Sequence, residues 1–295
     1  MLAPAMENTD KESPRQRDVQ RRFDRVADDP AAGEFVFATC RENLLERLLP
    51  MRVEAKRILI LGSGNGTAWR ELRKRFPGSR LICLDLSRRI LKSGLRPFSF
   101  FSRTSLLQAN AEAIPLRDGS VDVVVANLLL PWIANPPRLL QEVSRVLQKD
   151  GLFAFSSLGP DSLRELRDAF AADDFPHVRE FADMHNVGDA LIRAGFRDPV
   201  LDIDYLRFDY EDTRSLYRDL SATGARNSLA GRRRSLTGKQ RFRRVEDALR
   251  RQFHKQGLRL TLEFVYGHAW GGGPRRQTGE FSFRVDDLRG QRRNR

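Results

Sequence analysis

Three glycines follow an aliphatic run in the segment ILILGSGNGT, residues 58–67. Gly62, Gly64 and Gly66 alternate with other residues, and because glycine has no Cβ, such a turn lets a ligand approach the backbone closely. A dinucleotide-binding fingerprint needs a glycine where Thr67 stands, and a phosphate-binding P-loop needs a Gly-Lys pair that this segment lacks. The segment therefore favours a small-molecule site that differs from both of these nucleotide sites.

Polar residues at three later positions would share that site. Asp85 ends the second predicted strand, nineteen residues after Gly66, where its carboxylate can accept both hydroxyl groups of a ribose. Asn110 and Ala111 follow the third strand, where an amide side chain and a backbone N–H can bind the edge of an adenine. Asn127 ends the fourth strand, at the carboxyl edge where doubly wound sheets bind ligands. A turn, a helix cap or a strand end would explain each residue alone, but their joint occurrence in this order favours one binding crevice.

The order of these motifs resembles that of class I methyltransferases, which bind S-adenosylmethionine (SAM). The resemblance implies that SAM is the methyl donor and that it needs no metal. The four His and two Cys residues are also too scattered to suggest a structural zinc site. The predicted cofactor-binding residues are Gly62, Ser63, Gly64, Gly66, Asp85, Leu86, Asn110, Ala111 and Asn127.

Alternating strand and helix patterns predict an α/β fold with a doubly wound, Rossmann-like sheet. Parallel strands are expected at 57–62, 79–87, 105–109, 120–130 and 152–159, and two further strands at 199–208 and 258–270. The sheet is therefore expected to be mostly parallel and seven-stranded, with a helical insertion before the last strand. The predicted organisation is an N-terminal helical segment at 1–50, a SAM-binding core at 51–210, a basic helical insertion at 211–256, and the last strand with a basic tail at 257–295.

Positive charge is concentrated in the second half of the chain. Thirteen Lys or Arg residues and five acidic residues lie at 211–255, so this stretch holds +8 of the net charge of +13. The tail at 275–295 adds +4. Such a surface attracts an acidic partner, which could be a nucleic acid, an anionic membrane or an acidic protein, although a solvated arginine-rich surface is the simpler explanation.

Cysteine use and hydropathy predict a soluble, cytoplasmic protein. Cys40 and Cys83 form no disulfide framework, which favours a reducing compartment. The first residues contain no apolar stretch of signal-peptide length, and the most apolar region is interrupted by Asp122 and Asn127. No membrane association is expected.

Several segments outside the glycine loop are more discriminating. They are RRFDRVADD (21–29), FATCRENLLERL (37–48), NLLLPWI (127–133), GPDSLRELRDAF (159–170), FVYGHAW (264–270) and a long block that begins DMHNVGDALIRAGF (183–196) and runs to SLTGK (235–239). Together they resemble the malonyl-acyl-carrier-protein methyltransferases of biotin synthesis, from about Arg21 to Trp270. The resemblance implies methylation of the free carboxylate of a malonyl thioester that is attached to an acidic acyl carrier protein.

The resemblance also suggests how the substrate is held. A carboxylate is already ionised at neutral pH and needs no general base, and arginine suits it because its donors form a fork. The candidate catalytic residues are Arg41, before the first strand, and Arg232, Arg233 and Arg234 in the insertion, which would also dock the carrier protein. Ile60 stands where the family usually carries an acid that holds the methionine part of SAM. The loss of one charge-assisted hydrogen bond there would weaken SAM binding by about ten- to a hundredfold.

Three other functions stay open. The long block is also similar to an arginine hydroxylase of respiratory complex I assembly. An RNA methyltransferase would suit the basic insertion, although the chain has no recognised RNA-binding module and reads NLLLPW where base-amine methyltransferases carry an Asn/Asp-Pro-Pro-Tyr motif. A non-catalytic protein with the SAM-binding fold would follow if Ile60 abolished methyl transfer.

Overall fold

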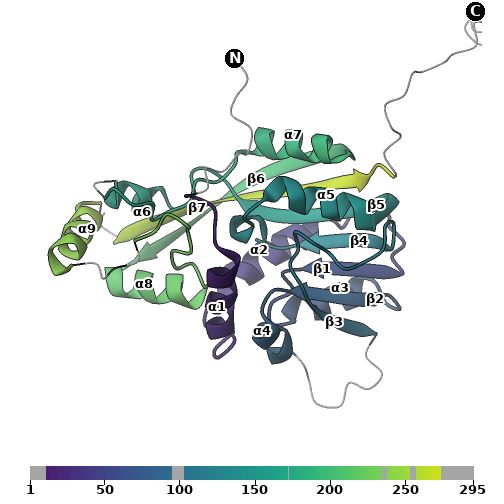
Figure 1. The fold of residues 1–295 in the computed structure, drawn as a ribbon, viewed down its shortest axis with the longest axis horizontal. Helices are drawn as coiled ribbons and strands as arrows, with labels where there is room; N and C mark the ends of the chain where they lie inside the picture. Colours follow the sequence, from purple (N-terminus) through teal and green to yellow (C-terminus); the bar gives the residue numbers. More distant parts are fainter. Residues whose placement is uncertain are drawn as a thin grey trace, which may run out of the picture.

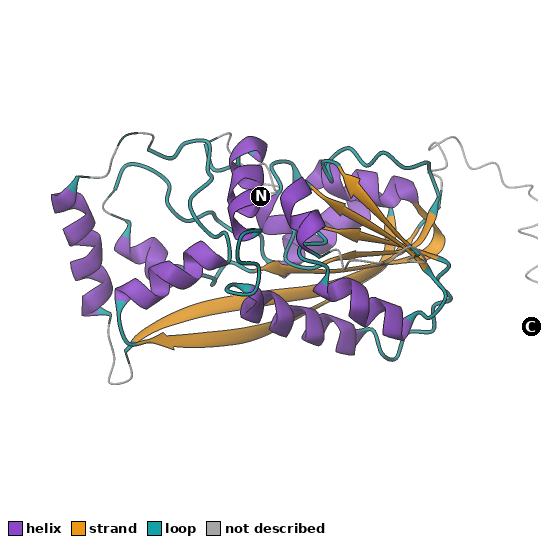
Figure 2. Ribbon diagram, turned by 90° about the horizontal axis from the view of Figure 1, so that it is seen from below, coloured by secondary structure: helices purple, strands orange, loops and turns teal. Residues whose placement is uncertain are grey.

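A twisted sheet of seven strands runs through the molecule in the order β3-β2-β1-β4-β5-β7-β6 (Figures 1 and 2). The computed structural model describes residues 11–94, 103–171, 173–233, 235, 238–252 and 257–273. The strands are β1 (Arg57–Leu61), β2 (Arg80–Asp85), β3 (Thr104–Gln108), β4 (Val121–Ala126), β5 (Leu147–Leu158), β6 (Phe196–Tyr210) and β7 (Leu258–Gly271). The first five strands pair in parallel, and β7 is antiparallel to both of its neighbours, β5 and β6. The predicted mostly parallel, doubly wound sheet is therefore confirmed.

Helices cover both faces of the sheet. One face packs against α5 (Pro136–Val146) and α7 (Met184–Ala194), whose buried Leu and Val side chains share a core with β4 and β5. The other face packs against α2 (Glu34–Arg47), α3 (Thr67–Arg75) and α4 (Arg88–Ser93). Every residue of β4 is buried, as expected for a central parallel strand that is covered on both sides.

The fourth strand ends earlier than the sequence predicts. We expected it to run to residue 130, but it stops at Ala126, and Leu128 adopts a left-handed backbone conformation with φ of 50°. A short 3-10 helix, η1 (Leu130–Trp132), follows, with Pro131 in its first turn. The apolar run NLLLPW is therefore a turn at the carboxyl edge of the sheet, and its hydrophobic side chains line a cavity there instead of extending the strand.

The β6–β7 pair is longer than the rest of the sheet. β7 pairs with β5 only from Phe264 onwards, whereas its first residues pair with β6 alone and project beyond the core as a two-stranded ribbon (Figures 1 and 2). The ribbon packs against α6 (Arg164–Ala169), α8 (Thr213–Ala222) and α9 (Lys239–Arg251) through a separate apolar cluster around Leu216 and Leu249. We refer to the ribbon and these three helices as the extension. The segment boundaries predicted from the sequence stay a prediction.

Helix α1 (Gln16–Val26) lies between the extension and the core (Figure 1). Asp18 forms an ion pair with Arg232, Pro14 forms a β-bridge with Leu229, and Asp24 accepts a hydrogen bond from Ser87. The N-terminal helix thus connects the two regions that flank the carboxyl edge of the sheet.

Candidate functional site

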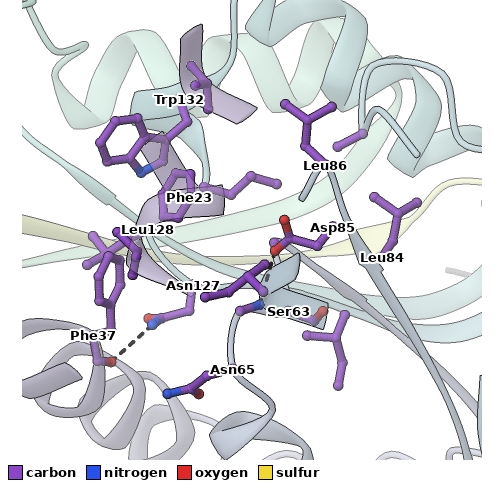
Figure 3. Close-up of a pocket in the computed structure, with 18 of the residues that line it drawn as sticks. Phe23, Phe37, Ser63, Asn65, Leu84, Asp85, Leu86, Asn127, Leu128 and Trp132 are labelled. Carbon is purple, nitrogen blue, oxygen red and sulfur yellow. Dashed lines mark hydrogen bonds between the residues drawn. The ribbon is translucent and has the colours of Figure 1, made fainter. Parts of the chain in front are cut away.

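An open cavity lies at the carboxyl edge of the sheet, where β1, β2 and β4 end. The loop after β1, the residues that follow β2, β3 and β4, and the helices α1 and α2 form its walls. In Figure 3, Asp85 and Leu86 lie on one side of this cavity, and Phe37, Asn127 and Leu128 lie on the other. This is the position at which doubly wound sheets bind ligands.

The glycine loop needs its glycines because of its backbone. Gly62, Gly64 and Gly66 have φ values of 60°, 57° and 86°, in the left-handed region that side chains disfavour. A Cβ on Gly62 would lie 3.1 Å from Leu129, whereas Gly64 faces open space. Gly62, Ser63 and Gly64 line the cavity, and Gly66 instead precedes the first turn of α3.

Asp85 is a buried carboxylate at the end of β2 and is 8 % exposed. Its two oxygens accept hydrogen bonds from the N–H groups of Gly64, at 3.1 Å, and Ser87, at 2.9 Å. Burial raises the pKa of Asp85 to about 6, and these backbone hydrogen bonds oppose the increase. Each carboxylate oxygen can still accept a hydroxyl group, which fits the predicted contact with a ribose.

Asn110, Ala111 and Leu86 lie beside Asp85 in the cavity wall. The side-chain oxygen of Asn110 accepts the N–H of Glu112 at 2.9 Å, so its amide nitrogen is the group that can face a ligand. Glu112 itself accepts the N–H groups of Ala134 and Asn135, and these bonds tie this wall to the segment after η1.

Asn127 lines the cavity and has hydrogen bonds within the protein through both ends of its amide. Its nitrogen donates to the carbonyl of Phe37 at 3.0 Å (Figure 3). Its oxygen accepts from Ser156 Oγ at 2.9 Å. Ser156 Oγ also accepts the N–H of Leu128 at 2.9 Å. These bonds hold α2 and the strained turn against each other. The role of Asn127 in binding the cofactor stays a prediction.

Arg41 is a buried cation in the wall near β1, and its residue is 5 % exposed. It contacts Glu34 at 2.8 Å and Glu71 at 2.7 Å, and Glu34 also accepts from the amide of Asn65 at 3.3 Å. Burial lowers the pKa of Arg41, but hydrogen bonds and charge from the two glutamates outweigh it, and the net shift is upward. Arg41 lines the cavity on the side of the glycine loop, and its predicted role in binding the substrate carboxylate stays a prediction.

The arginine run of the insertion does not line this cavity in the described residues. Arg232 forms an ion pair with Asp18 at 2.8 Å, and the guanidinium of Arg233 lies 4.3 Å from the ring centre of Phe175. Arg234 lies outside the described residues. Their predicted role in binding the substrate stays a prediction.

A second cavity adjoins the first. The two share Phe37, Leu128 and Trp132, and the second continues between the core and the extension, past Leu158, Leu220 and Leu260. Its only charged lining residue among those described is Asp219. Such a wall suits an uncharged, largely apolar group.

The residues present fit SAM. A cavity with two loop glycines at positive φ, a buried carboxylate that can accept hydroxyl groups, and a free amide beside it matches the ribose and adenine of an adenosyl group. Within the described ranges, no group of three or more His, Cys, Asp or Glu side chains is placed to hold a metal ion.

Comparisons with known proteins agree with this geometry. Residues 59–155 match the model of a methyltransferase domain. The chain is 38 % identical over 264 residues to a malonyl-acyl-carrier-protein O-methyltransferase of Gallionella capsiferriformans. The matched region covers 87 % of this chain and 91 % of that protein. It is 40 % identical to the enzyme of the same name from Laribacter hongkongensis, over 85 % of this chain and 88 % of the relative.

The chain belongs to the malonyl-acyl-carrier-protein O-methyltransferase family. Solved structures show the same fold at low sequence identity. A putative methyltransferase of Bacillus halodurans superposes with a TM-score of 0.57 at 14 % identity, over 80 % of this chain and 100 % of that one. Within the residues that the structure describes, no helix is long and apolar enough to span a membrane.

Three further residues line the cavity and were not predicted as site residues from the sequence. Phe23 and Trp132 meet edge to face, with ring centres 5.0 Å apart, and close the cavity opposite the glycine loop. Glu34 lines the cavity from the first turn of α2. Motif spacing could not reveal Phe23 and Glu34 because their positions depend on how α1 and α2 fold back onto the sheet.

Proposed function

We propose that this protein transfers the methyl group of SAM to the free carboxylate of a malonyl thioester carried by an acyl carrier protein. The observation that carries the proposal is the pairing of a cavity suited to an adenosyl group with an adjoining cavity that suits an uncharged arm. Relatives that are 38–40 % identical over most of their length bear the name of this enzyme.

The reaction needs little beyond positioning. One oxygen of the substrate carboxylate attacks the methyl carbon, the carbon–sulfur bond breaks, and its electron pair returns to sulfur, which leaves a methyl ester and S-adenosylhomocysteine. No proton moves, since a carboxylate is ionised at neutral pH. Holding two reacting atoms in line at about 3–3.5 Å can lower the barrier by about 7–11 kcal/mol. The chain's residues therefore act by binding, orienting and excluding water.

The shared wall of the two cavities is where we expect the reacting atoms to meet. Phe37, Leu128 and Trp132 are apolar and exclude water from this position. The thioester and the first part of the arm would extend into the second cavity, past Leu220 and Leu260. A free dicarboxylic acid would have to place its second charge in this apolar wall, near Asp219, at a high desolvation cost.

The carrier protein would dock on α9. Four exposed arginines of this helix form no ion pair with a described residue, namely Arg243, Arg244, Arg250 and Arg251. Arg232, in contrast, is paired with Asp18. Phe242, with 40 % exposure, lies on α9 and adds an apolar contact. We refer to the four exposed arginines as the α9 arginines. A cationic face of this kind steers an acidic protein towards the extension.

Methyl transfer to defined thioesters tests the proposal. Purified protein is incubated with labelled SAM and malonyl-carrier protein, malonyl-coenzyme A or free malonate, and the methyl esters are identified by mass spectrometry. We expect ester on both thioesters, faster on the carrier protein, and none on malonate. Methylated RNA or a hydroxylated arginine in place of ester would support the RNA methyltransferase or hydroxylase alternative, and SAM binding without any transfer would indicate a non-catalytic protein.

A further inference from the structure

The cavity at the carboxyl edge of the sheet, which we refer to as the cofactor cavity, has four charged lining residues among those described, and they lie in separate places. Asp85 and Glu112 are on the side of β2 and β3, whereas Glu34 and Arg41 are on the side of β1. Asp85 accepts two backbone N–H groups, and Glu112 accepts two others beyond η1. Arg41 is the single cation in this described set.

The sheet order gives the cavity a direction. Asn110 follows β3, Asp85 ends β2 and the glycine loop follows β1, and these strands are neighbours in the sheet. If adenine lies at Asn110 and ribose at Asp85, the amino-acid end of SAM must lie beyond the glycine loop. That end carries one ammonium and one carboxylate. Glu34 and Arg41 are the charged pair that lines the cavity there.

We infer that Glu34 and Arg41 bind the amino-acid end of SAM, with Glu34 accepting from the ammonium and Arg41 donating to the carboxylate. Glu34 is held in place by Asn65 of the glycine loop at 3.3 Å and by Arg41 at 2.8 Å. Arg41 has five N–H donors and uses three of them in its bonds to Glu34 and Glu71. Donors therefore remain for a carboxylate.

This arrangement explains how the site can work with Ile60. Ile60 lines the cavity and is 2 % exposed, with its side chain in the core that packs against α2. It offers no acceptor to an ammonium. Glu34, in the first turn of α2, lines the same cavity and provides the negative charge. An acid far away in the sequence thus replaces one that β1 lacks.

Glu71 provides a matched control. It binds the same arginine, at 2.7 Å, but it does not line the cavity. Loss of the Glu71 charge weakens the support of Arg41 without removing an acceptor for the ligand. A purely structural role of the network predicts similar effects of Glu34→Gln and Glu71→Gln, whereas direct contact with the ammonium predicts a large effect of Glu34→Gln alone.

Calorimetry with two ligands tests the inference, which rests on SAM being the methyl donor but not on the acyl substrate. The first ligand is SAM, and the second is 5′-methylthioadenosine, which lacks the amino-acid end. We expect Glu34→Gln to raise the Kd of SAM at least tenfold and that of methylthioadenosine less than twofold. Glu71→Gln should raise the Kd of SAM less than threefold.

Rescue adds a second readout. In the Glu34→Gln background, Ile60→Glu should restore part of the SAM affinity because it returns an acid to the same end of the cavity. If this double variant does not fold, Arg41→Lys is tested in its place. Arg41→Lys should weaken the binding of SAM but not that of methylthioadenosine. Equal SAM affinity of Glu34→Gln and wild type would overturn the inference, as would an equal loss for both ligands. If SAM binds as expected and no thioester is methylated, the proposed function fails and this inference stands.

Discussion

The cofactor cavity and the second cavity meet at Phe37, Leu128 and Trp132, yet their walls are built differently. The cofactor cavity uses backbone N–H groups, a buried carboxylate and a charged pair on the edge of a parallel sheet. The second cavity is nearly all hydrocarbon and lies between the sheet and the extension. The difference suggests that polar contacts select the methyl donor, whereas exclusion of charge selects the acceptor, and the following experiments separate these two roles.

The largest effect should come from the carboxylate that we expect to bind the ribose. Asp85→Ala removes a carboxylate that can accept two hydroxyl groups, and a hydrogen bond to a charged group is worth about 1.5–3 kcal/mol. We expect the Kd of SAM to rise at least tenfold and up to about a hundredfold. The KM of the thioester at saturating SAM should change little. Unchanged SAM affinity in calorimetry would remove Asp85 from the cofactor site.

The pH dependence of SAM binding should report the same carboxylate. Because burial raises the pKa of Asp85 to about 6, the group is charged at pH 7.5 and mostly protonated at pH 5. A protonated carboxyl is a weaker acceptor, so the Kd of SAM should rise about tenfold as the pH falls over this interval. Asp85→Asn should flatten this dependence, and a profile that is equally steep in the variant would assign the titration to another group.

The reaction with the carrier protein, which we expect to dock on the extension, should depend on ionic strength, whereas binding in the cofactor cavity should not. Replacing the α9 arginines with Ala should lower kcat/KM on malonyl-carrier protein about tenfold, since long-range steering scales association rates by at least this factor. The rate on malonyl-coenzyme A should fall much less. Salt should also slow only the carrier-protein reaction, because exposed charges are screened beyond about 10 Å at 0.1 M salt.

Arg232→Ala with Arg233→Ala serves as the control for the α9 arginines. Arg232 is paired with Asp18 and Arg233 lies over Phe175, so their removal should affect steering less than the loss of the four exposed arginines. A larger loss of the carrier-protein rate in this control, or equal rates on both thioesters in all variants, would contradict docking on α9.

The smallest effect should follow truncation of the second cavity. Leu220→Ala removes apolar surface from α8 at the wall of that cavity. With about 0.8 kcal/mol for each buried CH₂ group that loses its contact, the KM of the malonyl thioester should rise about threefold to tenfold, and the Kd of SAM should stay unchanged. A change in SAM affinity of the same size would mean that the two cavities are not separate binding sites.

The positions of the glycine loop and Asp85 were easier to predict from the sequence than those of the residues on α2, for a physical reason. The glycine loop and Asp85 depend on local backbone geometry and on strand ends, and both can be read from spacing. The positions of Glu34 and Arg41 depend on how α2 folds onto β1, which no local pattern encodes. Leu128 looked like part of a strand because it is apolar, but its left-handed backbone makes it a turn.

The extension was the hardest part to predict. Its helices were expected from the sequence between the last two strands, but the second cavity brings together residues from α2, η1, β6, α8 and β7. Arg232 was predicted to bind the substrate carboxylate, and its ion pair with Asp18 of α1 could not be predicted from the sequence. Charge density in a sequence does not distinguish cations that are paired internally from those that face a partner.

The continuity of β7 has a consequence for how this protein unfolds. Its first residues, Leu258 and Leu260, belong to the apolar cluster of the extension, and Phe264 and Tyr266 belong to a core of the main sheet. The uninterrupted strand β7 therefore contributes side chains to two hydrophobic cores. Both cores share the continuous β6–β7 hydrogen-bond ladder, so we expect the extension and the sheet to unfold as one cooperative unit and not as two independent modules.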